Sequence, residues 1–311
     1  MPLHPVLVKM LEAGHQAGRP AIAVCTPGEA RSLLSSSCSA LGPGPQVGPV
    51  SDLTIPTRVG PMAARLFRPQ EAEKGLIVYV HGGGWVIGAL ADFDALSRNL
   101  VARSGCAVLL IDYRLAPEHK FPAGLEDVED AIRWAAAQRQ QLVEAEVPLV
   151  VAGDSAGANL ATVAVRTLAK EINVSLQLLF YPVADCDTDT TSYREHAEGL
   201  FISRADMQWF FSHYAPAQQW SDPRISPLRA DDLDGLPPAW IAVAEYDVLH
   251  DEGVAYAQRL GAAGVPVQLR VYEGMGHGFA RMMNFVDTAD RALDDAAAAV
   301  RSRCRDGPGA G

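Results

Sequence analysis

Short apolar runs alternate with helical segments along most of this chain, and this alternation constrains the fold more than any other feature. The later runs are nearly all apolar, as expected for strands buried on both faces of a parallel sheet. Eight such strands with interleaved helices predict a doubly wound α/β layout. The predicted strands are Ser51–Pro56, Ala63–Phe67, Leu76–Val80, Ala107–Ile111, Pro148–Ala152, Leu176–Tyr181, Ala239–Val243 and Pro266–Tyr272. The predicted helices are Phe93–Ser104, Leu125–Gln138, Ala156–Lys170, Val254–Ala263 and Asp287–Arg303.

Two segments do not follow this alternation of predicted strands and helices. Residues 1–45 combine a short amphipathic start with a Ser-rich stretch and a Gly/Pro run. Residues 185–226 are polar but rich in aromatic side chains. In open α/β sheets, ligands bind at the carboxyl ends of the strands. Catalytic or binding residues are therefore expected at those ends.

Charge and cysteine content exclude several classes of protein. Lys and Arg number 26 against 37 Asp and Glu, a net charge of −11, and no basic cluster is present for nucleic acid. Neither a signal peptide nor an apolar run long enough to span a membrane is found, so we expect a cytoplasmic protein. A disulfide framework and a zinc site are not expected from the scattered cysteines, which are Cys25, Cys38, Cys106, Cys186 and Cys304.

The segment Gly153-Asp-Ser-Ala-Gly157 connects a predicted buried strand to a predicted helix. G-x-S-x-G in this context is typical of a tight turn that projects a nucleophilic serine above the sheet. Side chains at Gly153 and Gly157 would collide with neighbouring backbone. The helix that follows points its N–H groups toward developing negative charge. We therefore predict that Ser155 is a nucleophile rather than an ordinary turn residue.

A glycine-rich segment, His81-Gly-Gly-Gly-Trp85, follows the predicted strand Leu76–Val80. Consecutive glycines leave backbone N–H groups open to a substrate carbonyl oxygen, which is what an oxyanion hole requires. A flexible loop or a phosphate cradle is the alternative, but the phosphate-binding motifs G-x-x-x-x-G-K-[ST] and G-x-G-x-x-G are absent. Beside Ser155, the oxyanion hole is the better interpretation.

A serine nucleophile needs a histidine base and an acid that orients it. Among eight histidines, His277 lies between glycines just past the last predicted strand. Asp247 follows the preceding predicted strand, whereas Asp251 and Glu252 resemble the capping acids of a helix start. We therefore predict Asp247 as the acid, with Ser155, Asp247 and His277 in the chain order of α/β-hydrolases.

These motifs together resemble those of the bacterial hormone-sensitive-lipase family of carboxylesterases, also called family IV esterases. The stretches that carry the resemblance are His81–Trp85, Asp112–Glu118, Gly153–Gly157, Asp247–Glu252 and Gly276–Phe279, in family order. The resemblance implies an α/β-hydrolase fold, a mostly parallel eight-stranded sheet flanked by helices and carrying a helical cap. The cap would consist of residues 1–45 and 185–226, and the core of residues 46–184 and 227–311.

The resemblance also implies that the backbone N–H groups of Gly83, Gly84 and Ala156 form the oxyanion hole. Two interpretations of Trp85 stay open, since this side chain could line a substrate pocket or belong to a small aromatic core. Arg114 is interpreted as the partner of a buried carboxylate.

The leading hypothesis is hydrolysis of small carboxylic esters with short-to-medium acyl chains, through an acyl-enzyme on Ser155. Amide or peptide hydrolysis by the same residues stays open, as does a non-catalytic ligand-binding receptor. Plant hormone receptors that resemble this family lack the catalytic histidine, whereas His277 is present. We expect a small-molecule ester as the partner and no cofactor or metal. The sequence does not distinguish a monomer from a homodimer.

Overall fold

One sheet organises the part of the chain that the computed structural model describes, residues 1–143 and 146–305. Within these residues the sheet has eight strands in the order β1-β2-β4-β3-β5-β6-β7-β8. The β1–β2 and β2–β4 pairs are antiparallel and the other neighbours are parallel, which confirms the predicted mostly parallel layout. The strands are β1 (Val50–Thr57), β2 (Gly60–Phe67), β3 (Leu76–Val80), β4 (Ala107–Ile111), β5 (Leu149–Asp154), β6 (Leu176–Phe180), β7 (Ala239–Tyr246) and β8 (Val267–Gly276).

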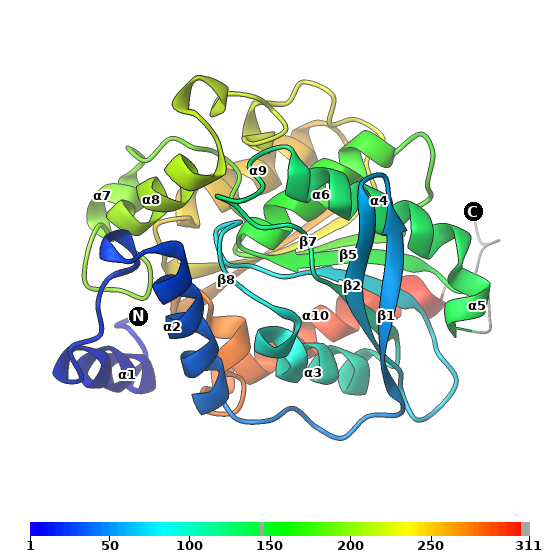
Figure 1. The fold of residues 1–311 in the computed structure, drawn as a ribbon, viewed down its shortest axis with the longest axis horizontal. Coiled ribbons are helices and arrows are strands. Elements are labelled where there is room, and N and C mark those ends of the chain that lie inside the picture. The colour runs from blue at the N-terminus through cyan, green and yellow to red at the C-terminus, as the bar shows by residue number, and fades with distance from the viewer. Residues whose placement is uncertain (144–145, 306–311) are drawn as a thin grey trace.

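Helices cover both faces of the sheet (Figure 1). On one face lie α4 (Ala123–Ala137), α6 (Ala156–Leu168) and α9 (His250–Ala262), with the short α5 (Arg139–Val143) following α4. On the other face α3 (Asp94–Ser104) packs against α10 (Asp287–Arg305). Every residue of the central strands β3, β4, β5 and β6 is buried. No helix in residues 1–143 or 146–305 is long and apolar enough to cross a membrane.

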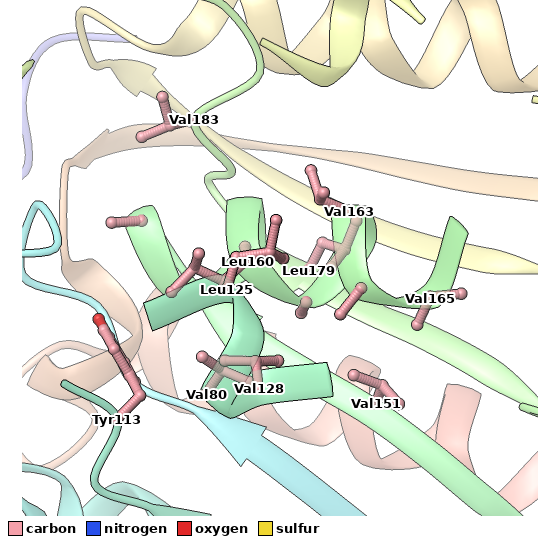
Figure 2. Close-up of a cluster of buried hydrophobic side chains, with 14 of the residues drawn as sticks. Val80, Tyr113, Leu125, Val128, Val151, Leu160, Val163, Val165, Leu179 and Val183 are labelled. Carbon is pink, nitrogen blue, oxygen red and sulfur yellow. The ribbon is translucent and has the colours of Figure 1, made fainter. Parts of the chain in front are cut away.

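The hydrophobic core between the sheet and the helices α4, α6 and α9 includes β5 and α6, the strand and the helix on either side of Ser155. Figure 2 shows Leu125 of α4 beside Leu160 of α6 and Val128 of α4 beside Val80 of β3, with Val151 of β5 nearby. All five side chains are at most 2% exposed. Burial of an aliphatic side chain contributes about 1.5–3 kcal/mol. This packing fixes the strand-to-helix connection between β5 and α6 rigidly.

The two segments that depart from the alternating pattern fold into short helices near one another (Figure 1). The first contains α1 (Pro5–Gln16), η1 (Ile22–Val24) and α2 (Pro27–Ala40). The second contains α7 (Thr191–Glu195), α8 (Arg204–Tyr214) and η3 (Ala217–Gln219). Ala23 N donates to Asp206 Oδ1 at 2.8 Å and joins the two segments directly. Elements labelled η are short 3₁₀-helices, and the remaining ones are η2 (Leu90–Phe93), η4 (Pro227–Arg229) and η5 (Phe279–Met282).

The last two strands extend beyond their predicted ends. β7 ends at Tyr246 and β8 at Gly276, with a register shift between Ala244 and Tyr246. The glycines near the end of β8 suggested a loop from sequence, because glycine is depleted in strands. Pairing with β7 keeps this segment extended, and His277 therefore follows the sheet edge directly.

The predicted structural role of Arg114 is confirmed. Its Nε lies 2.8 Å from Asp127 Oδ2, and the side chain of Asp127 is 2% exposed. Arg114 also donates from Nη2 to Ala123 O at 3.1 Å. The ion pair therefore fastens the segment after β4 to the first turns of α4.

Candidate active site

Ser155 lies in the connection between β5 and α6, at the carboxyl end of a central strand. Its φ of 55° and ψ of −123° form a backbone conformation that few non-glycine residues adopt. A Cβ at Gly153 would lie 2.6 Å from Gly157 C, and one at Gly157 would lie 2.1 Å from Val80 O. The backbone leaves no room for a side chain at either glycine. The turn is therefore tight enough to present Ser155 Oγ at the edge of the sheet.

Three side chains from three strand ends form one hydrogen-bonded chain. His277 Nε2 lies 3.0 Å from Ser155 Oγ, and His277 Nδ1 lies 2.7 Å from Asp247 Oδ2. His277 follows β8 and Asp247 follows β7, so neighbouring parallel strands bring them together. Asp247 is 2% exposed, and its Oδ1 accepts a hydrogen bond from Leu249 N at 3.0 Å. With Nδ1–H donating to the carboxylate, the imidazole presents an unprotonated Nε2 to the serine hydroxyl.

Asp251 and Glu252 lie in the first turn of α9, as predicted, but their hydrogen bonds run to backbone outside the helix and not to its own N–H groups. The N-cap position, Leu249, makes no side-chain capping bond. Asp251 Oδ2 instead accepts from Ser192 N at 2.9 Å, and Glu252 Oε1 accepts from Ala184 N at 2.8 Å. Burial raises the pKa of Glu252 well above its usual value. Both side chains therefore hold residues at the start of the 185–226 region against α9.

The glycine-rich loop after β3 faces the same serine. Gly83 and Gly84 have φ values of 117° and 57°. Among the hydrogen bonds of the described residues, none uses the backbone N–H of either glycine. Ala156 is the first residue of α6, so its N–H precedes the bonds within that helix. Three backbone donors are thus available near Ser155.

Asp154 ties the serine turn to the glycine-rich loop, a role that the sequence did not reveal. Its Oδ1 accepts from Gly82 N and from Tyr79 Oη, each at 2.9 Å. The residue is 3% exposed, and burial raises the pKa of its carboxyl group. The aspartate before Ser155 in the motif was the available signal, but its partners lie more than seventy residues away in the chain.

A cavity of about 470 Å³ opens at Ser155 and His277. Gly83 and Gly84 lie in its wall, and Asp154, Arg19 and Arg281 are its charged residues. Apolar side chains supply most of the rest, from both atypical segments and from the region after β8. They include Val6, Met10, Ile22, Leu34, Ile87, Phe201, Ile202, Phe210, Met282 and Phe285. In residues 1–143 and 146–305 no cluster of three His, Cys, Asp or Glu side chains is placed to hold a metal ion.

Trp85 lies outside this cavity wall. Its side chain is 1% exposed, and its ring stacks on Tyr214 with centroids 4.4 Å apart and an angle of 5°. Phe211 lies 5.6 Å away on the same helix, α8. This arrangement corresponds to the aromatic-core interpretation of Trp85, in which it joins the glycine-rich loop to α8.

His81, at the start of the glycine-rich loop, is buried between two rings. Its centroid lies 5.1 Å from that of Phe93 and 4.5 Å from that of Tyr113, and its Nδ1 lies 2.8 Å from Gly82 O. Burial penalises the imidazolium and lowers the pKa of His81 to about 4. The folded protein therefore holds this histidine neutral.

We expect His81 to make the folded state sensitive to acid. Below pH 6.5 the unfolded chain binds a proton at this residue, whereas the folded chain binds one only near pH 4. Above pH 6.5 His81 therefore has no effect on the free energy of unfolding. As the pH falls from 6.5 to about 4, His81 lowers this free energy by up to about 3 kcal/mol. Urea unfolding of the wild type and of His81→Phe across this window measures the effect. The difference between the free energies of unfolding of the two proteins should change with pH. If the two free energies depend on pH in the same way, His81 is not the source of the acid sensitivity.

Comparison with known proteins places the chain in a family. A family described by the α/β-hydrolase fold matches residues 77–281. An ethyl acetate hydrolase of Pseudomonas putida is 37% identical over 308 residues, which are 94% of this chain and 96% of that protein. The carboxylic ester hydrolase LipN of Mycobacterium tuberculosis is 37% identical over 313 residues, 96% of this chain and 83% of that protein.

Solved structures agree with the sequence relatives. A hyperthermophilic esterase of the archaeon Pyrobaculum calidifontis superposes with a TM-score of 0.92 at 37% identity, over 97% of this chain and 99% of that one. An esterase of Pseudomonas putida also has a TM-score of 0.92, at 31% identity over 97% and 98% of the two chains. The predicted fold and enzyme class are therefore confirmed. The chain belongs to the hormone-sensitive-lipase family of carboxylesterases, within the α/β-hydrolase superfamily.

Proposed function

We propose that this carboxylesterase hydrolyses small esters with short-to-medium acyl chains through an acyl-enzyme on Ser155. The observation that carries the proposal is the hydrogen-bonded chain Ser155–His277–Asp247, with distances of 3.0 and 2.7 Å. Its members have the roles of nucleophile, general base and orienting acid. A buried Asp247 keeps the proton on Nδ1 and stabilises the imidazolium that forms when Nε2 takes the serine proton.

Each half-reaction moves one proton through His277. In acylation, Ser155 Oγ attacks the ester carbonyl carbon while Nε2 accepts its proton. The tetrahedral intermediate then expels the alcohol, which receives that proton from Nε2. In deacylation, water attacks the acyl-enzyme, His277 accepts the water proton and returns it to Ser155 Oγ, and the carboxylic acid leaves.

The oxyanion of each intermediate would be held by the backbone N–H groups of Gly83, Gly84 and Ala156. Support for this comes from the unused donors of the two glycines and from the first position of Ala156 in α6. The N-terminus of α6 adds a favourable potential for negative charge at the same place.

Gly83→Ala tests this role by steric means. A Cβ at Gly83 would lie 2.1 Å from Ile87 O, a backbone atom that cannot rotate away, and the φ of 117° disfavours alanine. The loop must therefore shift, and we expect kcat/KM to fall about 10²–10³-fold, as for the loss of one oxyanion donor. Gly235→Ala, at a positive φ with open space around the added carbon, is the matched control and should keep its activity. Equal activities of the two variants would argue against an oxyanion hole at Gly83.

Residues 1–45 and 185–226 are proposed as a cap over the core formed by residues 46–184 and 227–311. Both segments contribute apolar side chains to the cavity at Ser155, and the bond from Ala23 N to Asp206 Oδ1 joins them. A mostly apolar cavity of about 470 Å³ is of the size that holds a small ligand. A cytoplasmic location remains a prediction of the sequence alone.

Nitrophenyl esters of graded acyl length, with a nitroanilide as the amide control, test the substrate class. We expect kcat/KM to be highest for short-to-medium chains and to fall about tenfold or more for chains that outgrow the cavity. We also expect the anilide to be cleaved far more slowly than the ester of the same acyl group. A maximum at long chains would overturn the proposed chain length, and comparable anilide cleavage would favour an amide hydrolase.

A further inference from the structure

Two of the five cysteines meet on the side of the molecule away from Ser155. Cys106 Sγ and Cys304 Sγ lie 3.6 Å apart although the residues are 198 positions apart in the chain. Cys106 immediately precedes β4, and Cys304 lies in the last turn of α10. A Cβ at Gly75 would lie 2.8 Å from Cys304 Sγ and 2.9 Å from Cys106 Sγ. The missing side chain of Gly75 therefore leaves the space in which the two sulfur atoms approach each other.

The two thiols differ in solvent exposure and in pKa. Cys106 is fully buried, whereas Cys304 is partly exposed to solvent. The hydrogen bond from the Cys106 thiol lowers the pKa of Cys304, and thiolates rather than thiols react with oxidants. Among the described residues, no other pair of cysteines shows a contact between sulfur atoms.

We propose that Cys106 and Cys304 form an oxidation site that hydroperoxides convert into a disulfide linking the start of β4 to α10. The Cys304 thiolate attacks the O–O bond of the hydroperoxide and becomes a sulfenic acid, and the leaving oxygen takes a proton to form water or an alcohol. Cys106 then loses its proton and attacks the Cys304 sulfur, which releases the sulfenic oxygen as water. Two thiols and one hydroperoxide thus give one disulfide, one water and one further water or alcohol.

Closing the bond requires the sulfur atoms to approach from 3.6 Å to about 2.05 Å. The terminal turn of α10 can supply this movement because Cys304 is the next-to-last residue of the helix as the structure describes it. The disulfide would link α10, which packs on α3 and on the sheet, to the start of β4. A link across so long a chain separation restricts the unfolded state strongly.

The site is remote from the proposed catalytic residues. Cys106 precedes the amino end of β4, whereas Ser155 follows the carboxyl end of β5. The strands β4, β3 and β5 are neighbours and run parallel. The length of β4, five residues, alone separates the two edges by about 17 Å. Oxidation should therefore change stability and leave ester hydrolysis unchanged.

The experiment treats the purified full-length protein with a small excess of hydrogen peroxide, blocks the remaining thiols with iodoacetamide and digests without reductant. Mass spectrometry should find the Cys106 and Cys304 peptides joined, two hydrogen masses lighter than their sum, and dithiothreitol should separate them. The Tm should rise by on the order of 5 °C on oxidation and return on reduction.

Cys304→Ser should abolish both the cross-link and the shift in Tm. Cys38→Ser is the matched control, because Cys38 is also partly exposed but has no sulfur neighbour among the described residues, and it should retain both. A cross-link between other cysteines, covalent dimers in place of the internal link, or oxidation of Cys304 to sulfinic acid without a link would each overturn the proposal.

Discussion

Ser155→Ala is expected to lower kcat for a nitrophenyl ester by about 10⁴-fold or more while leaving the fold unchanged. The hydroxyl oxygen is the atom that would form the covalent bond, and within the described residues its only hydrogen bond is the one to His277. Alanine can keep the same turn, because the positive φ of Ser155 is imposed by its surroundings and not by the hydroxyl. The free energy of unfolding should therefore change by no more than about 1 kcal/mol.

A buried serine elsewhere serves as the control for that experiment. Ser97 in α3 is fully buried, and its Oγ has no hydrogen-bond partner among the described residues. Ser97→Ala should retain full activity at similar stability. A phosphonate ester should add one equivalent to the wild type, on the peptide that contains Ser155, and none to Ser155→Ala. An active Ser155→Ala protein, or an adduct on another peptide, would remove Ser155 from the mechanism.

Local patterns with a direct physical meaning were sufficient to predict much of this molecule. Central strands were evident because both of their faces are buried, which leaves almost no polar residue in β3, β4, β5 or β6. The glycines around Ser155 were informative because the backbone forbids any other residue at those positions. Asp247 and His277 could be selected from many acids and histidines because each directly follows a parallel strand, and such ends converge on one edge.

Contacts between segments that lie far apart in the chain could not be predicted from local sequence patterns. Asp154 bonds to Tyr79 and Gly82 across the sheet, and Glu252 bonds to the backbone at Ala184, although both acids also fit ordinary local roles. The end of β8 was placed too early, because pairing with β7 overrides the weak strand preference of its glycines. The contact of Cys106 with Cys304 also depends on how α10 returns to the sheet.

Asp247→Asn is expected to lower kcat by about 10⁴-fold with little loss of stability. Asparagine retains the shape of aspartate, and its oxygen can still accept from Leu249 N. Its amide nitrogen would face His277 Nδ1, however, and a donor there forces Nδ1 to accept. The proton then moves to Nε2, which can no longer accept the proton of Ser155 Oγ. Steady-state kinetics on a short-chain nitrophenyl ester, with urea unfolding alongside, measures both effects.

Asp251→Asn is the matched control, because it makes the same chemical change four residues along the chain. Asp251 accepts from Ser192 N at 2.9 Å and, within the described residues, forms no hydrogen bond or ion pair with Ser155 or His277. An asparagine oxygen can still accept that bond, so only the charge near the first turn of α9 is lost, at a cost of about 0.5–1 kcal/mol in stability. The activity of this variant should stay within about twofold of the wild type. The two variants therefore separate an acid that orients His277 from one that fastens α7 to α9, and a larger loss of rate at Asp251 would reverse the assignment.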